Sequence, residues 1–266
     1  MTTPGTPPLA PLVFITGASS GIGQALAARY ARAGWRLALV ARRTDVMQDW
    51  ARQQGLAAER VAVYGADVAD TQSIVDAGHA CLAAQGVPEV VIANAGISIG
   101  VDTSVRADLD VIARTFAVNN VGLAATFHPF IAPMTARGSG TLVGVASVAG
   151  IRGMPGHGAY CASKAAVISY CESLRGELRA GGVRVLTLSP GYVATPLTRR
   201  NRYPMPFLMT ADRFADRAFR AIAAGGAHRI IPWQMALVAG VLRVLPAAWL
   251  DRLLAGRPRK QRQGEA

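Results

Sequence analysis

The sequence has few lysines and few cysteines, and it contains no long uninterrupted apolar run. Lysine occurs twice, at Lys164 and Lys260, among 28 lysine and arginine residues. Repeats of about 20 to 50 residues and low-complexity stretches are absent, which excludes a repeat architecture. Hydrophobic residues make up 51% of the 266 positions and charged residues 17%. The composition therefore predicts one large globular unit with an ample core.

Metal ligands are also scarce. Neither the cysteines, Cys81, Cys161 and Cys171, nor the scattered histidines show the paired spacing of a metal site, so no metal is expected. Residues 1–10 lack the basic segment of a signal peptide and are predicted to form a disordered leader. Without an export signal, we expect free thiols and a cytoplasmic location.

The net charge of +12 at pH 7 favours an acidic partner, such as nucleic acid, an anionic membrane or an acidic cofactor. No basic stripe interleaved with aromatic residues is found, so nucleic-acid binding is not expected. Much of the excess charge lies near the C-terminus, at Arg252, Arg257, Arg259, Lys260 and Arg262.

Short aliphatic runs alternate with longer alanine-rich segments along most of the chain. Continuous apolar strands that alternate with helices indicate a parallel sheet covered on both faces. We therefore predict an α/β fold of the Rossmann type, a doubly wound sheet of seven parallel strands with helices on both faces. Glycines that end helical segments are Gly34, Gly86, Gly138 and Gly225. The expected strands are 12–16, 36–41, 60–65, 89–94, 140–147, 183–190 and 228–232.

A glycine-rich turn, TGASSGIG, follows the first expected strand and opens the first helix. Small residues let the backbone approach a pyrophosphate, and the helix N-terminus offers unpaired N–H groups. An ordinary glycine-rich turn is the alternative, because the spacing GxxxGxG differs from the common GxGxxG fingerprint. The candidate cofactor residues here are Gly17, Ser19, Ser20, Gly21, Ile22 and Gly23.

The second expected strand ends in alanine followed by Arg42 and Arg43. An acidic residue at this place binds the ribose hydroxyls of NAD, whereas an arginine binds a 2′-phosphate. The sequence therefore favours NADP(H) over NAD(H), with solvated arginines as the alternative.

One of the two lysines, Lys164, lies four residues after Tyr160. On a helix both side chains would share one face. A nearby ammonium favours the phenolate and lowers a tyrosine pKa from about 10. Proton transfer by Tyr160 is therefore one interpretation, and a solvated lysine is the other.

Together these motifs resemble the short-chain dehydrogenase/reductase family over about residues 10 to 200. YCASK resembles the family's YxxxK motif, VASVAG its serine-bearing strand end and VNNVG its active-site asparagine. The resemblance implies Tyr160 as general acid and base, and Ser147 as hydrogen-bond donor to the substrate oxygen. It also implies Lys164 on the cofactor ribose and Asn119 on a water that links Lys164 to solvent.

Three further segments resemble cofactor-binding elements of the family: ADV (66–68), ANAG (93–96) and PGYVAT (190–195). The first resembles the adenine contact, the second the central strand beside the cofactor, and the third the nicotinamide side, where Thr195 would bind the carboxamide. The cofactor residues implied are Asp67, Val68, Asn94, Ala95, Gly96, Tyr160, Lys164, Pro190, Gly191, Val193 and Thr195.

The segment after Pro196 is expected to form a lid at about 196–212 within a single catalytic domain over 11–232. Its apolar side chains would suit a hydrophobic carbonyl or alcohol substrate. The side chains expected at this wall are Met154, Tyr192, Tyr203, Pro206, Phe207 and Met209.

Residues 233–266 are predicted to form a C-terminal helix and a basic tail. The stretch 230–250 is interrupted by prolines and an arginine, which makes it too broken to span a membrane. Trp233 and Trp249 beside a basic tail are compatible with peripheral membrane contact. Packing on the body or on a dimer partner is the alternative.

The sequence thus predicts an NADP(H)-dependent enzyme that interconverts a carbonyl and a secondary alcohol on a hydrophobic small molecule. The alternatives are a 3-oxoacyl thioester (acyl-carrier-protein) reductase and a non-catalytic cofactor-sensing protein. By the resemblance we expect a homodimer through helices at about 107–136 and 158–180, in the cytoplasm or at the inner membrane surface.

Overall fold

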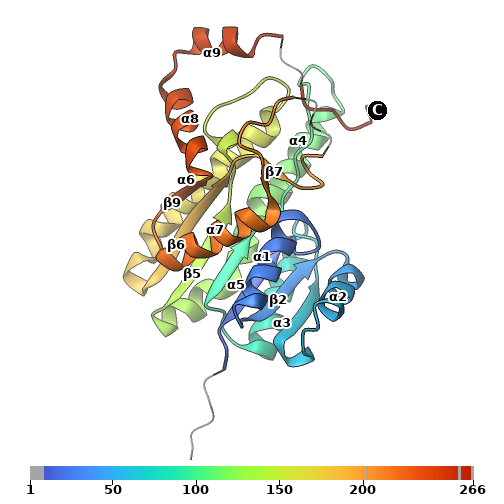
Figure 1. Ribbon diagram of the computed structural model, residues 1–266, viewed down its shortest axis with the longest axis vertical. Helices are drawn as coiled ribbons and strands as arrows, with labels where there is room; N and C mark the ends of the chain where they lie inside the picture. Colours follow the sequence, from blue (N-terminus) through green and yellow to red (C-terminus); the bar gives the residue numbers. More distant parts are fainter. Residues whose placement is uncertain (1–8, 200, 202, 257–258, 265–266) are drawn as a thin grey trace, which may run out of the picture.

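A computed structural model describes residues 9–199, 201, 203–256 and 259–264. Seven parallel strands form one sheet in the order β3-β2-β1-β4-β5-β6-β9 (Figure 1), which confirms the predicted fold. The strand order reverses between β1 and β4, the position at which doubly wound sheets bind ligands. The bounds are β1 Leu12–Thr16, β2 Arg36–Ala41, β3 Val61–Gly65, β4 Val90–Ala93, β5 Gly140–Val145, β6 Val183–Pro190 and β9 His228–Ile231.

Helices cover both faces of the sheet because the strands are apolar on both faces. In β1, Leu12 and Phe14 belong to one core cluster, while Val13 and Ile15 belong to the other. The first cluster packs against α3 (Thr71–Gln85), α5 (Gly122–Arg137) and α6 (Gly158–Leu178). The second packs against α1 (Gly21–Arg32), α2 (Thr44–Gln53) and α7 (Ala211–Ala224).

The helical segment expected at about 107–136 is divided into two helices. A π-helical turn at Ala117–Val121 separates α4 (Asp108–Phe116) from α5 and carries Asn119. The four glycines expected at helix ends all have positive φ, between +69° and +87°, which glycine adopts without steric cost. Short 3₁₀ turns lie at Ala58–Arg60, Val148–Gly150 and Arg179–Gly181.

The C-terminal part contains two helices where the sequence predicted one. Two helices, α8 (Trp233–Val244) and α9 (Ala247–Leu254), are separated at Pro246, which cannot continue a helix. The chain then returns to the body, where Arg262 forms a β-bridge with Gly100. Figure 1 shows α8 and α9 standing beyond the sheet, above α6 and α7.

Part of the segment expected to form the lid belongs to a strand and a helix. β8 (Met209–Thr210) pairs with β7 (Val193–Ala194), and residues 211 and 212 already belong to α7. At the other end of the chain, the Ala10 carbonyl accepts a hydrogen bond from Arg36 at 2.9 Å, so the expected leader reaches the body by this residue. Residues 1–8 of the leader, residues 200 and 202 of the lid, and Arg257 lie outside the described residues.

Candidate active site

A cavity of about 1410 Å³ lies at the carboxyl ends of the strands. Its wall runs from the glycine turn past Ser147 and Tyr160 to the inner sides of α8 and α9. The volume exceeds the range of about 300 to 1,000 Å³ that holds one drug-sized ligand. All the predicted site residues line this cavity except Gly23 and Asn119, which lie directly behind its wall.

The glycine turn is held against the end of β4. Gly17 has φ +67°, and a Cβ on Gly23 would collide with the Gly17 carbonyl. The Asn94 amide donates to the Thr16 carbonyl at 3.0 Å, and the Asn94 N–H donates to the Thr16 hydroxyl at 3.1 Å. Ser20, Gly21 and Ile22, where α1 begins, line the cavity. This cradle fits a pyrophosphate.

Arg42 and Arg43, the two arginines expected to bind a 2′-phosphate, line the cavity just after β2. Arg42 lies 3.7 Å from the Asp67 carboxylate, and Arg43 donates to the Ser19 hydroxyl at 3.4 Å. Arg42 is therefore within ion-pair distance of Asp67. Arg43 is the arginine in contact with the glycine turn. The donor set fits a phosphate group at this edge of the cavity.

Ser147, Tyr160 and Lys164 meet at the centre of the cavity. Tyr160 and Lys164 share one face of α6, with the Lys164 Nζ 5.9 Å from the Tyr160 ring centroid. Ser147 is hydrogen-bonded to the Tyr160 phenol. The Lys164 Nζ donates to the Val145 carbonyl at 2.8 Å and is buried. The solvated-lysine interpretation is therefore wrong.

Burial sets the proton affinities of this pair. It raises the pKa of Tyr160 to about 12, although the hydrogen bond with Ser147 acts in the opposite direction. It lowers the pKa of Lys164 to about 8, because a buried ammonium loses its hydration. Desolvation is the largest effect on the Tyr160 pKa, and Lys164 does not contribute the expected lowering.

Asn119 links the end of β4 to the start of α6. Its Oδ1 accepts from the Ile97 N–H at 2.9 Å, and its Nδ2 donates to the Ile97 carbonyl at 3.0 Å and the Ser163 hydroxyl at 2.9 Å. Both amide hydrogens are therefore used within the protein. A Cβ on Gly96 would lie 3.2 Å from Oδ1 and 3.4 Å from the Lys164 Nζ, so these groups are close neighbours. A relay water at this residue would have to donate to an oxygen atom of Asn119.

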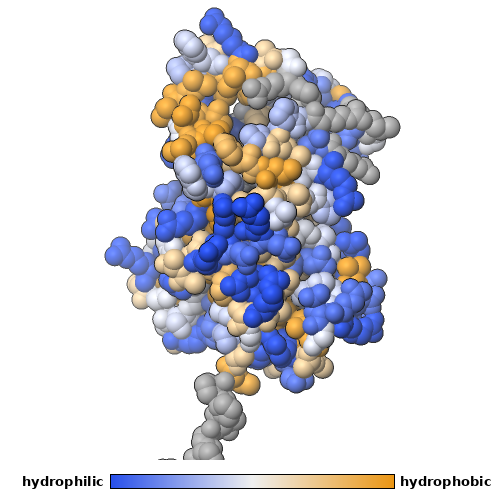
Figure 2. Space-filling view, viewed as in Figure 1, coloured by the Kyte–Doolittle hydropathy of each residue, from blue (hydrophilic) through white to orange (hydrophobic). Residues whose placement is uncertain are grey.

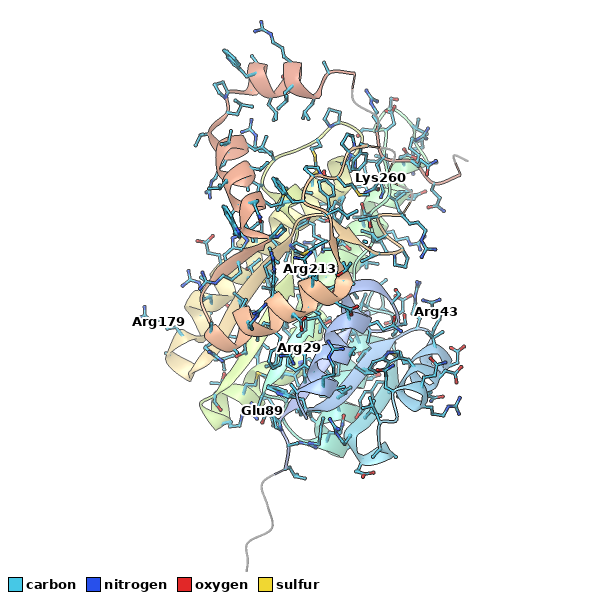
Figure 3. All side chains as sticks on the ribbon, viewed as in Figure 1. Arg29, Arg43, Glu89, Arg179, Arg213 and Lys260 are labelled. Carbon is cyan, nitrogen blue, oxygen red and sulfur yellow. The ribbon has the colours of Figure 1, made fainter. Side chains whose placement is uncertain are left out.

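Some cavity residues were not predicted from the sequence. His157 is buried, and its Nε2 lies 3.2 Å from the Tyr203 hydroxyl. Burial lowers the pKa of His157, so its neutral form is favoured. Lys260, the second lysine, lies on the C-terminal segment (Figure 3). It lines the cavity and donates to Asn201 at 2.6 Å. The position of His157 three residues before Tyr160 could have identified it.

The apolar wall is made partly of different residues from those expected. Met154, Tyr192, Tyr203 and Pro206 line the cavity as predicted. Phe207 points to solvent, and Met209 is buried in the core beneath α7, so both predictions are wrong. Their places are taken by aliphatic side chains of α8 and α9, namely Met235, Val238, Ala239, Leu242, Leu250, Leu253 and Leu254.

The described part of the chain has neither a metal-binding cluster nor a membrane-spanning helix. No group of histidine, cysteine, aspartate and glutamate there could hold a metal ion. Nor is any helix of that part long and apolar enough to cross a membrane. Cys81, Cys161 and Cys171 are buried free thiols.

Comparison with known proteins identifies the family. A family model for short chain dehydrogenases matches residues 11–205. An uncharacterized oxidoreductase of Myxococcus xanthus (strain DK1622) is 38% identical over 241 residues, covering 90% of this chain and 94% of that protein. The chain therefore belongs to the short-chain dehydrogenase/reductase family, whose members are oxidoreductases.

Two solved structures share the fold at moderate identity. An alcohol dehydrogenase from the archaeon Thermococcus sibiricus, complexed with 5-hydroxy-NADP, is 26% identical with a TM-score of 0.73, covering 84% of this chain and 96% of that one. A 3-ketoacyl-(acyl-carrier-protein) reductase from Brucella melitensis, complexed with NADH, is 25% identical with a TM-score of 0.74, covering 84% and 97%. A nicotinamide dinucleotide is thus the cofactor type found among these neighbours.

Proposed function

We propose that the protein is an NADP(H)-dependent oxidoreductase that interconverts a carbonyl and a secondary alcohol on a hydrophobic small molecule. The supporting observation is one cavity that joins the glycine turn to Ser147, Tyr160 and Lys164 and continues between α8 and α9. A dinucleotide and a lipophilic substrate would therefore meet beside the Tyr160 hydroxyl.

In this proposal the protein supplies placement and proton transfer. NADPH, when bound, supplies the hydride. Ser147 would donate a hydrogen bond to the substrate oxygen, where negative charge develops during reduction. Tyr160 would protonate that oxygen, and in the oxidative direction it would accept the proton. Lys164 would stabilise the resulting phenolate and hold the cofactor ribose, while Asn119 would orient a relay water beside it.

The preference for NADP(H) rests on Arg42 and Arg43. The neighbouring structures contain an NADP derivative in one case and NADH in the other, so likeness to them favours neither cofactor. β2 ends at Ala41 and is followed by two arginines, so the acidic residue that would bind the ribose hydroxyls of NAD is absent there. Arg43, in contact with Ser19, and Arg42, beside Asp67, would together bind the 2′-phosphate.

The hydrophobic substrate is supported by the aliphatic wall from α8 and α9, where Val238 and Leu242 face the cavity. The second candidate, a 3-oxoacyl thioester reductase, is supported by likeness to the Brucella melitensis enzyme and by the basic surface. Assays with aliphatic ketones of increasing chain length and with an acetoacetyl thioester separate the two.

The proposal includes a homodimer and a cytoplasmic location. The pairing surface would comprise α4, α5 and α6, which correspond to the helices expected at 107–136 and 158–180. The three buried free thiols suit a reducing compartment.

The experiment is calorimetric titration of NADPH and NADH into the wild-type protein and into the variants Arg42→Ala and Arg43→Ala. We expect NADPH to bind the wild type at least about tenfold more tightly than NADH, a difference of ~1.4 kcal/mol. Each variant should lose much of this preference while keeping its affinity for NADH. Arg52→Ala, on the exposed side of α2, is the matched control and should bind like the wild type.

Equal affinity for the two cofactors would disprove the 2′-phosphate assignment and leave the family reaction intact. If neither cofactor bound, the proposal of an active enzyme would fail, and a non-catalytic protein would become the better interpretation.

A further inference from the structure

Helix α8 is apolar on both sides. Met235, Val238, Ala239 and Leu242 form its inner face, where they line the cavity. Trp233, Leu237, Val241 and Val244 recur at the spacing of the opposite face. A helix that is apolar all round is expected to be covered on both sides.

The outer face of α8 is largely exposed to solvent. Trp233 and Leu237 are each 64% exposed, Val241 is 62% exposed and Val244 is 80% exposed. Across the Pro246 bend, Trp249 of α9 is 64% exposed. Figure 2 shows the resulting hydrophobic patch over α8 and α9 at the upper left. We call these five residues the outer patch. Contiguous exposed apolar surface of this kind marks a binding surface, because water solvates it poorly.

The charges near the outer patch favour an anionic surface over a second copy of the chain as its binding partner. Arg243 directly precedes Val244 on α8, and Arg252 lies on α9 one turn after Trp249. Asp251 is the acidic residue within these two helices, and the whole chain carries a net charge of +12. Two copies meeting through their patches would bring these arginines together. An anionic surface would be attracted to them.

Tryptophan and arginine beside exposed aliphatic residues form the pattern of a helix that lies in the plane of a lipid interface. In such helices the indole rings occupy the headgroup region, the aliphatic side chains enter the acyl boundary, and the guanidinium groups contact lipid phosphates. A helix of 12 residues can lie in this plane, although it is too short to cross a bilayer.

We propose that α8 and α9 dock the protein on an anionic lipid bilayer, with the outer patch immersed at the interface and Arg243 and Arg252 at the phosphates. This docking does not depend on the proposed reaction, because it uses the faces of α8 and α9 that point away from the cofactor residues.

The experiment is flotation of the full-length protein with vesicles of phosphatidylcholine alone and of phosphatidylcholine with phosphatidylglycerol. The wild type should float with the anionic vesicles and much less with the neutral ones. The double variant Leu237→Gln/Val241→Gln should lower the bound fraction at limiting lipid at least about tenfold. Leu208→Gln is the matched control, since Leu208 is an exposed leucine outside the outer patch, and it should float like the wild type.

The variant Arg243→Gln/Arg252→Gln separates the electrostatic contribution. Each arginine near an anionic surface contributes ~1 kcal/mol, a factor of about five in affinity. Binding to anionic vesicles should therefore weaken strongly, while residual binding to neutral vesicles stays the same. Thermal unfolding of every variant, monitored by circular dichroism, tests whether the compared proteins are folded.

Two results would overturn the proposal. One is failure of the folded wild-type protein to float with anionic vesicles. The other is concentration-dependent self-association in sedimentation velocity that Leu237→Gln/Val241→Gln abolishes, without any vesicle binding. That result would assign the outer patch to a second copy of the chain.

Discussion

At the scale of single residues, the Tyr160 hydroxyl is the group that the proposed chemistry depends on most. It is hydrogen-bonded with Ser147 and lies on the wall of the cavity. Tyr160→Phe removes the transferable proton but keeps the ring and its packing. We expect turnover to fall about 10²- to 10⁴-fold, the usual contribution of a positioned acid or base. Cofactor affinity measured by calorimetry should change little, and retained turnover would remove Tyr160 from the mechanism.

Lys164 should make the free energy of unfolding rise with pH between about 8 and 10.5. Its pKa falls from 10.5 to about 8 on folding, so between these values the unfolded chain binds a proton that the folded chain does not. Stability then rises with pH across this window, because burial of the ammonium is costly below it. The free energy of unfolding, measured by urea denaturation between pH 7 and 10, should rise for the wild type relative to Lys164→Met. A difference that stays constant with pH would contradict the assignment.

Residues within local motifs were predictable, whereas residues joined by the folded chain were not. Gly17, Tyr160 and Lys164 stand in short segments whose spacing carries their role. The contact of Arg42 with Asp67 depends on how the ends of β2 and β3 approach each other. Lys260 enters the cavity because the chain turns back after α9, and no sequence period records that turn.

At the scale of elements, the C-terminal segment is fastened to the body by Arg262. Its guanidinium donates to both oxygens of Asp108 at 2.7 and 3.1 Å, and Asp108 is nearly inaccessible to solvent. The Gly100 N–H donates to the Gln261 carbonyl at 2.9 Å beside this ion pair. Because Lys260 of the same segment donates to Asn201, the segment connects the loop before α4 with the lid.

Arg262→Gln should release this segment without unfolding the sheet. We expect hydrogen exchange of the Gly100 amide to accelerate at least about tenfold, the equivalent of ~1.4 kcal/mol of local stability. Mass spectrometry of deuterated peptides measures this, with peptides from β1 and β4 as internal reference. Arg106→Gln is the matched control, since Arg106 forms an exposed ion pair with Asp110 that contributes little. Equal protection at Gly100 in Arg262→Gln and the wild type would show that Arg262 does not fasten the segment.

The strands were predicted within one or two residues, because buried parallel strands are continuous apolar runs between turns. The π-helical turn at 117–121 was not, since its five residues, AVNNV, include no proline or glycine that would mark an irregular turn. The break at Pro246 is a local signal. The return of residues 259–262 to Gly100 is a long-range contact and has no such signal.

At the scale of the whole molecule, the same two helices serve the cavity and the outer patch. Inner residues such as Leu242 line the space beside Tyr160, and outer residues such as Val241 face solvent. If both proposals hold, a lipophilic substrate could pass between bilayer and cavity without crossing bulk water. The basic net charge, which composition alone could not assign to a partner, would then act at the docking face and at the cofactor phosphate.

The scarcity of lysine has a consequence for chemical labelling. Both ε-amino groups of the chain belong to side chains that line one cavity, and burial lowers the pKa of each, which increases the fraction of nucleophilic free amine. An amine-acylating reagent would therefore leave the arginine-rich exterior unmodified apart from any terminal amine. Its attachment to Lys164 or Lys260 would report, by mass alone, whether a ligand shields the interior.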